Sequence, residues 1–142
     1  MHYEVTVEIE APPEAVWSLL TDVERWPQWT ASMTSVRRLD SGEIHVGSEA
    51  RVKQPGLLDA TWRVTELAPG CNFTWESRSL GVRVVGGHLI KGVDGGRSAV
   101  TVTVHQTGPI MALARPFVEG LTCRYLAIES AGLKRRCEGK TP

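Results

Sequence analysis

His88 is the polar side chain of this sequence whose surroundings best suit acid–base chemistry. In the segment VRVVGGHLIK, His88 has the same parity as Val84 and Ile90, so the three share one face of a predicted β-strand. An apolar environment favours the neutral imidazole, which can act as a general base. Two alternatives compete with this interpretation. The ring can be held by a hydrogen bond to a neighbouring strand, or a bulge at the preceding glycine pair can turn it outward.

The remaining sequence motifs offer little other chemistry. His105 has the parity of polar residues and is expected at the surface, while His2 and His45 lie near a chain end and a turn. No histidine pair has ligand spacing with a carboxylate, and there is no C-x-x-C motif, so we expect neither a metal nor another cofactor. A Gly-x-Ser-x-Gly elbow and a phosphate-binding loop are also missing from the sequence.

Two tryptophans flank a proline in the segment TDVERWPQWT, directly after a predicted helix. Trp26 and Trp29 are large aromatic residues at a helix break. They either fill the core as scaffold or form the rim of a hollow. Pro27 predicts that the short helix VERW ends before it, because the residue preceding a proline disfavours the helical conformation.

The elements that must position these residues follow from hydrophobic periodicity. Alternation over residues 2–10 predicts a strand, and APPEAVWSLL predicts a short helix that begins at its prolines. Residues 32–106 read as strands separated by glycine- and proline-containing turns. Apolar residues at helical spacing from Ile110 to about Cys137 predict a helix of ~27 residues, with a kink or restart at Pro116.

This order predicts an α+β fold, with one domain over residues 1–142. A highly curved antiparallel sheet of about seven strands grips the long C-terminal helix, and two short helices follow the first strand. Such a sheet can leave space between itself and the helix, and spaces of this kind bind small molecules.

Composition excludes several classes of function. Sixteen basic and sixteen acidic residues give no net charge, which argues against nucleic acid as the main partner. No apolar run is long enough to span a membrane. Three cysteines without paired spacing and the lack of a signal peptide predict a reduced, cytoplasmic protein, either monomeric or homodimeric.

The segment VEIEAPPEAVWSLLTDVERWPQW resembles the N-terminal signature of the START-like, or SRPBCC, superfamily and its polyketide cyclase/dehydrase and lipid-transport group. VGSEARV, ATWRVTELAPGCNFTWES and GLKRRCE stand where that family has strands and its terminal helix, so the resemblance covers nearly the whole chain. It implies a helix-grip fold with a deep apolar cavity. It does not settle function, because members include ligand carriers, cyclases and hormone receptors.

Two hypotheses of function follow from the resemblance. In the first, the cavity binds a lipid- or polyketide-like small molecule and no chemistry occurs. In the second, the chain is a cyclase/dehydratase-type enzyme in which His88 and Tyr125 transfer protons. The expected cavity residues are Trp62, Phe73, Trp75, Val84, His88, Met111, Phe117 and Tyr125, with Trp26, Trp29 and Arg115 at the rim.

Overall fold

The computed structural model describes residues 1–79 and 81–139, which form a seven-stranded antiparallel sheet, two α-helices and one 3-10 helix. In chain order the elements are β1 (His2–Ile9), α1 (Pro13–Thr21), the 3-10 helix η1 (Val23–Gln28), β2 (Ser35–Arg38), β3 (Glu49–Lys53), β4 (Ala60–Ala68), β5 (Asn72–Ser79), β6 (Val82–Val93), β7 (Arg97–Thr107) and α2 (Met111–Cys137).

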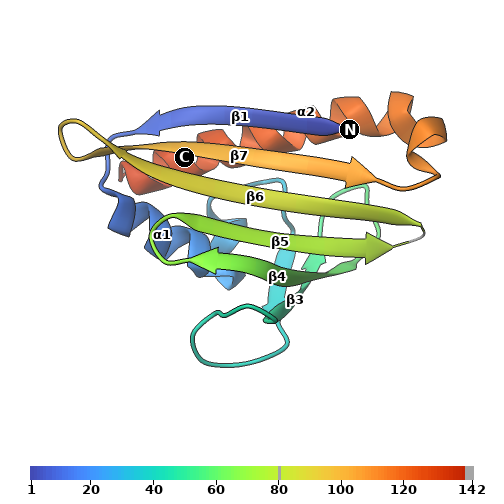
Figure 1. Ribbon diagram of the computed structural model, residues 1–142, viewed down its shortest axis with the longest axis horizontal. Helices are drawn as coiled ribbons and strands as arrows, with labels where there is room; N and C mark the ends of the chain where they lie inside the picture. Colours follow the sequence, from blue (N-terminus) through green and yellow to red (C-terminus); the bar gives the residue numbers. More distant parts are fainter. Residues whose placement is uncertain (80, 140–142) are drawn as a thin grey trace.

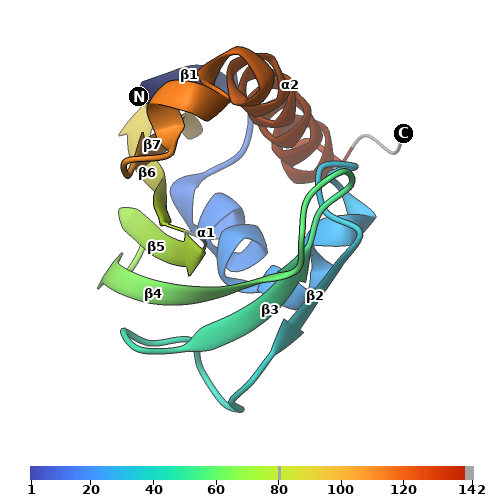
Figure 2. The same cartoon turned by 90° about the vertical axis from the view of Figure 1, so that its right-hand side faces the viewer.

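The sheet curls around the helices, as predicted. Its strand order is β1-β7-β6-β5-β4-β3-β2, so the first strand pairs with the last and the rest form a meander. Figure 1 shows the strands side by side with α2 behind them, and Figure 2 shows the sheet curving from β1 to β2 around α1 and α2. Apolar residues at alternate positions, such as Val7 paired with Val100, put one face of the sheet against the core.

α2 lies across the concave side of the sheet and contacts β1, β7 and α1. Near its C-terminal end the helix packs directly on the backbone that follows η1. A Cβ atom added at Gly132 would overlap the carbonyl oxygen of Trp29, so only glycine permits this approach. The long helix is therefore fixed on the segment that carries the tryptophans.

The helix break around Trp26 differs from the sequence prediction. η1 continues through Pro27 to Gln28. Hydrogen bonds at its two ends run from Arg25 N to Asp22 O and from Trp29 N to Trp26 O, and neither of these requires the N–H that Pro27 lacks.

α2 is continuous through Pro116, so no second helix restarts there, and it differs from the prediction in the side that it buries. Its exposed side chains include Leu113 and Phe117, which belonged to the apolar stripe expected on the buried side. The side that faces the protein carries Met111, Thr122, Leu126, Ser130 and Leu133 instead. None of the helices within residues 1–79 and 81–139 combines the length and apolar character needed to cross a membrane.

Candidate functional site

A cavity of about 500 Å³ lies between the concave face of the sheet and α2. The sheet contributes apolar side chains from β4 to β7, and α2 closes the opposite side with Tyr125 and Leu126. Trp26 of η1 also lines the cavity. The sheet residues in its apolar wall include Trp62, Trp75, Val84, Val102 and Val104. This combination of a mainly apolar wall and a few polar groups is typical of small-molecule sites.

His88 points into this cavity and is 3% exposed. The pairing of β6 with β5 and β7 keeps its register through Gly86 and Gly87, so no bulge turns the ring outward. The rings of Trp26 and Phe73 contact the imidazole edge-on, with centroids 5.3 and 5.5 Å away. The strand alternation read from the sequence therefore gives the correct face for His88.

Both nitrogens of His88 have hydrogen-bond partners. Nδ1 lies 3.1 Å from the Phe73 carbonyl oxygen, and Nε2 lies 2.9 Å from Oε1 of Glu129 on α2. A carbonyl only accepts, so Nδ1 carries a proton. Nε2 and the Glu129 carboxylate are close enough to exchange a proton. The arrangement can therefore give or take one proton at a group that lines the cavity.

The two glycines before His88 serve close packing. The indole of Trp75 lies over Gly86, where an added Cβ would contact it at 3.4 Å and would also meet the ring of Trp62 at 3.6 Å. On the other face, a Cβ at Gly87 would meet the hydroxyl oxygen of Thr103 at 2.5 Å. Gly86 is therefore in ordinary contact with the two indoles on the cavity face, while Gly87 leaves room for the Thr103 hydroxyl on the other face.

A second polar pair bridges the sheet and α2. Gln106 of β7 is 6% exposed, and its Nε2 donates to Oγ1 of Thr122 at 3.0 Å. Its Oε1 is buried and has no hydrogen-bond partner in the part of the chain that the structure describes. Both residues line the cavity. A buried hydrogen-bond acceptor without a donor lowers the stability of the folded state, so the position of this oxygen is unusual.

The loop between β3 and β4 closes one side of the cavity. Tyr125 lines the cavity, but its hydroxyl donates to the carbonyl of Pro55 in this loop. Figure 2 shows the loop reaching α2. Leu57 and Leu58 of the loop, together with Ile110 before α2, line the cavity and are also exposed, so they lie at its mouth.

The structure brings together five of the eight residues expected to line the cavity, namely Trp62, Trp75, Val84, His88 and Tyr125. Phe73 is fully buried behind the wall, and Met111 is buried at the start of α2 outside it. Phe117 is 82% exposed, because the N-terminal part of α2 turns that side to solvent. Of the expected rim residues, Trp26 lines the cavity, whereas Trp29 packs on Trp26 and Arg115 is exposed.

Glu129, Gln106 and Thr122 were not among the residues singled out from the sequence. A signal existed for Glu129, since positions 122, 126, 129 and 133 follow helical spacing and place a carboxylate between Leu126 and Leu133 on the buried side. Gln106 ends the alternation of Val100, Val102 and Val104 on β7 and continues their inward parity. A polar residue that keeps the parity of a buried face indicates a role inside the protein.

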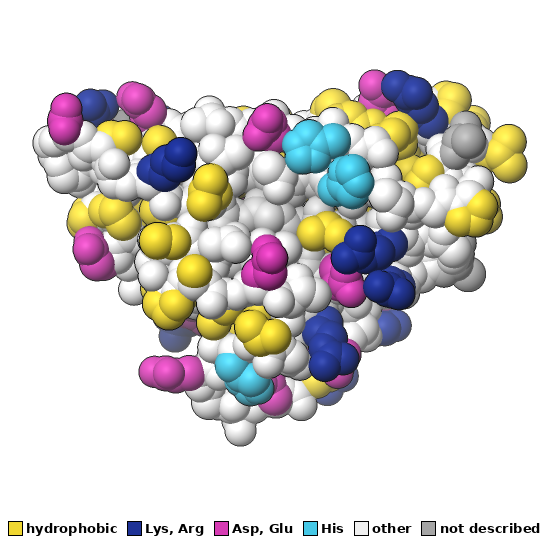
Figure 3. Space-filling view, viewed as in Figure 1, with side chains coloured by type: hydrophobic (Ala, Val, Ile, Leu, Met, Phe, Trp, Pro, Cys, Tyr) yellow, Lys and Arg dark blue, Asp and Glu magenta, His cyan; other side chains and the backbone are white. Residues whose placement is uncertain are grey.

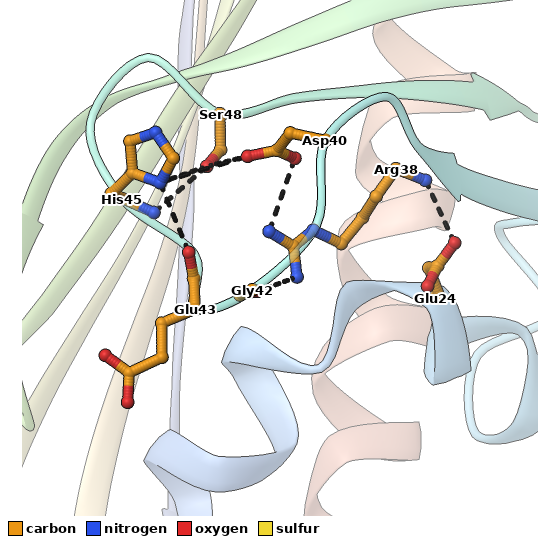
Figure 4. A network of polar contacts seen from close by, with 7 residues as sticks. All are labelled: Glu24, Arg38, Asp40, Gly42, Glu43, His45 and Ser48. Atoms are coloured by element: carbon orange, nitrogen blue, oxygen red, sulfur yellow. Dashed lines mark hydrogen bonds and ion pairs between the residues drawn. The ribbon is translucent and has the colours of Figure 1, made fainter.

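A separate cluster of polar side chains lies in the loop between β2 and β3 (Figure 4). Asp40, His45 and Ser48 are the residue types of a hydrolytic triad, but Ser48 Oγ donates directly to Asp40 Oδ2 at 2.9 Å. In a triad the imidazole stands between serine and carboxylate, so this cluster is not arranged for nucleophilic attack. The Ser48 hydrogen bond lowers the pKa of Asp40, and Arg38 ties the same carboxyl group to the loop. The cluster stabilises the loop.

Figure 3 shows several basic side chains close together on the outer face of the sheet, below the end where α2 begins, with acidic side chains among and around them. Hydrophobic side chains lie at both ends of this face. Within residues 1–79 and 81–139, no group of histidine, cysteine, aspartate and glutamate side chains is arranged to hold a metal ion.

Comparisons with known proteins agree with this architecture. The family model described as "Polyketide cyclase / dehydrase and lipid transport" matches residues 1–138. Among solved structures, the ZhuI aromatase/cyclase from Streptomyces sp. R1128 superposes with a TM-score of 0.81 at 20% identity, covering 97% of this chain and 93% of that one. A START superfamily protein from Mycobacterium smegmatis gives 0.78 at 19% identity, covering 97% of each chain. A search of the curated proteins found no match.

Proposed function

Because the chain belongs to the polyketide cyclase / dehydrase and lipid transport family, we propose that it binds an apolar or aromatic small molecule, lipid- or polyketide-like, between the sheet and α2. The observation that carries this proposal is the cavity of about 500 Å³ with its wall of tryptophan and valine side chains. Transfer of apolar ligand surface from water into it contributes ~25 cal/mol per Å², less the cost of ordering the ligand.

The test uses two tryptophan variants on the same strand. Val84→Trp puts a bulky ring into the cavity, whereas Leu89→Trp adds the same ring on the outer face, where Leu89 is exposed. Wild type and both variants are screened by thermal shift against fatty acids, sterols and polycyclic aromatics, after native mass spectrometry of the fresh protein. At ~100-fold above Kd a ligand adds roughly 2.7 kcal/mol to the free energy of unfolding, because it binds only the folded state.

We expect one chemical class to raise the Tm of wild type and Leu89→Trp by several degrees and to leave Val84→Trp unchanged. Stabilisation of Val84→Trp as large as that of wild type would place binding elsewhere on the molecule. If no class stabilises wild type and no mass co-purifies, the binding proposal is wrong.

A second candidate function is proton-transfer chemistry of the cyclase/dehydratase type. The specific observation that favours it is the bond of His88 to Glu129 at the cavity wall. Cyclisation with loss of water requires a base that removes a proton from carbon and an acid that protonates the departing oxygen. Glu129 is better placed for this than Tyr125, whose hydroxyl donates to Pro55. The name of the Streptomyces neighbour, an aromatase/cyclase, describes a reaction of this kind.

The two candidates make different predictions for Glu129→Gln. The amide keeps a hydrogen-bonding group beside His88 but does not exchange a proton at neutral pH. A naphthyl β-hydroxy ketone is the probe, and its dehydration to the conjugated enone is followed by absorbance. For an enzyme we expect loss of dehydration by roughly 100-fold or more with binding retained. Wild-type protein that binds the probe without dehydrating it would exclude this activity for that substrate class.

A further inference from the structure

Four arginines lie in one row across the outer face of the sheet. The strand register places Arg37 of β2 opposite Arg51 of β3, and Arg78 of β5 opposite Arg83 of β6. Thr61 of β4, which is opposite Arg51, joins these two pairs into a single row. All four arginines are exposed, and the row crosses five strands, a distance of ~19 Å at the usual strand spacing.

This arrangement does not favour folding of the sheet. Like charges that face each other directly on antiparallel strands repel, and the row contains two such pairs. Glu76 offsets part of the repulsion, since Nε of Arg83 donates to it at 2.7 Å and Arg78 lies 3.6 Å away. Arg51 donates to the hydroxyl of Thr61, a neutral group that leaves its charge in place. An anion bound between the guanidinium groups would relieve the remaining repulsion.

The carboxylates of this part of the outer face lie behind the arginine row. Glu49, Arg63 and Glu76 pair across β3, β4 and β5, two residues farther from the strand ends, which corresponds to ~7 Å. Lys53 lies on the opposite side of the row, at the end of β3. The outer face is therefore basic near this end of the sheet and mixed in charge toward the middle.

The arginine row runs close behind the mouth of the cavity. Each member lies one or two residues from the end of its strand. Arg78 directly precedes Ser79, and Arg83 directly follows Val82, and both of these neighbours line the cavity. Figure 2 views the molecule from this end and shows β2 to β6 arranged in an arc. The guanidinium groups consequently form an arc around one side of the mouth, at a similar distance from it.

The mouth itself presents apolar side chains to solvent. Leu58 in the loop between β3 and β4 is 74% exposed, and Leu57 and Ile110 beside the opening are also exposed. The loop carries one acidic residue, Asp59. Its single charge is outweighed by the four arginines of the row.

We propose that this end of the protein docks on the surface of an anionic phospholipid bilayer. Leu57 and Leu58 insert among the headgroups, and the arginine row contacts the lipid phosphates, which the planar guanidinium group matches with paired hydrogen bonds. A flat surface meets the whole arc only when it faces the mouth, because the outer face of the sheet is convex (Figure 2). The exposed leucines favour a bilayer over an acidic protein or a nucleic acid, since only the bilayer offers them an apolar interior.

Docking of this kind goes beyond the proposed function, because it needs no ligand in the cavity. The test measures flotation of the protein with vesicles of phosphatidylcholine alone, or with roughly 30% phosphatidylglycerol, at about 0.1 M NaCl. We expect wild type to bind the anionic vesicles at least about tenfold more tightly than the neutral ones, and to lose most of this preference at about 1 M NaCl, where charges are screened.

Two double variants with the same change in charge identify the arginine row. Arg37→Gln with Arg51→Gln should weaken binding to anionic vesicles roughly 10- to 30-fold, the effect of two cations at an anionic surface. Lys91→Gln with Arg135→Gln removes two exposed cations far from the mouth, on the later part of β6 and in the last turn of α2. This control should bind within about twofold of wild type.

A second pair of variants tests the orientation. Leu58→Ser should weaken binding roughly three- to tenfold, because it removes apolar surface that enters the bilayer. Leu89→Ser removes an exposed leucine from the outer face of β6 and should leave binding unchanged. Val84→Trp, which fills the cavity, should also bind vesicles as wild type does, so failure of ligand binding and failure of docking are distinguishable.

Several results would overturn the proposal. Equal binding of wild type to both kinds of vesicle, or none to either, would exclude docking on an anionic bilayer. Unchanged binding of the Arg37→Gln, Arg51→Gln variant would show that the row takes no part. If wild type instead binds poly-L-glutamate or an oligonucleotide through these arginines and ignores the vesicles, the row serves another acidic macromolecule and the bilayer proposal is wrong. Circular dichroism checks that every variant folds.

Discussion

Separating His88 from Glu129 is expected to destabilise the protein, although the pair lies where a ligand would bind. Glu129→Leu leaves Nε2 of a side chain that is 3% exposed without its partner at 2.9 Å. The cost of leaving a buried polar group unsatisfied is ~1–3 kcal/mol. In a chain of this size each kcal/mol lowers Tm by roughly 2–4 °C, so a fall of about 2–12 °C is expected.

The partner variant and the double variant complete a thermodynamic cycle. His88→Phe fits among the rings of Trp26 and Phe73 but leaves the Glu129 carboxylate, which is 12% exposed, against an apolar wall. Replacing both residues by apolar ones removes the two unsatisfied groups together. The double variant should therefore be nearly as stable as wild type, with a coupling energy of ~1–3 kcal/mol.

Urea unfolding monitored by tryptophan fluorescence provides the free energies for this cycle. Glu129→Gln is the matched control, because its side chain can still hydrogen-bond Nε2 and should lose less stability than Glu129→Leu. Strict additivity, with the double variant as unstable as the two single variants combined, would refute the pairing of His88 with Glu129.

Other predictions concern groups outside the proton-transfer pair. Burial raises the pKa of Cys137 to about 11, so only about one Cys137 thiol in a thousand is ionised at pH 8. Maleimide should therefore react first with the exposed Cys71 and Cys123, as followed by mass spectrometry. Equal labelling of the three cysteines would contradict the burial of Cys137. The lowered pKa of Asp40 contributes stability above its unfolded pKa, and this stability is lost as the pH falls through the folded value. Asp40→Asn should therefore flatten the acid side of the Tm profile below about pH 4, and an unchanged profile would exclude the effect. Tyr125→Phe removes the hydroxyl bond to the loop and should speed ligand dissociation roughly three- to tenfold in stopped-flow measurements; an unchanged rate would show that the loop does not limit exit.

The curved sheet and the face of His88 were predictable because strand alternation has a short, unambiguous period. Val84, His88 and Ile90 share a face only if β6 stays regular, and the register through Gly86 shows that it does. The reason for Gly87 was not predictable, because it depends on the hydroxyl of Thr103 on a neighbouring strand.

The orientation of α2 was the main difficulty. Apolar residues occur on several sides of this helix, so Phe117 satisfies the helical period as well as Leu126 does. Which side faces the sheet is decided by tertiary packing, including the contact of Gly132 with the backbone of Trp29. Glu129 and Gln106 were overlooked for the same reason, since their polar character suggests solvent until their neighbours are known.

The most direct test of the binding cavity is a methyl NMR titration of the wild-type protein with 7-hydroxyflavone. Val84, Val102 and Leu126 line the cavity, and Leu113 represents the exposed apolar surface of α2. The cavity predicts saturable shifts of the first three methyl resonances and little change at Leu113. Shifts confined to Leu113, or none at the cavity methyls at saturating probe, would contradict binding between the sheet and α2.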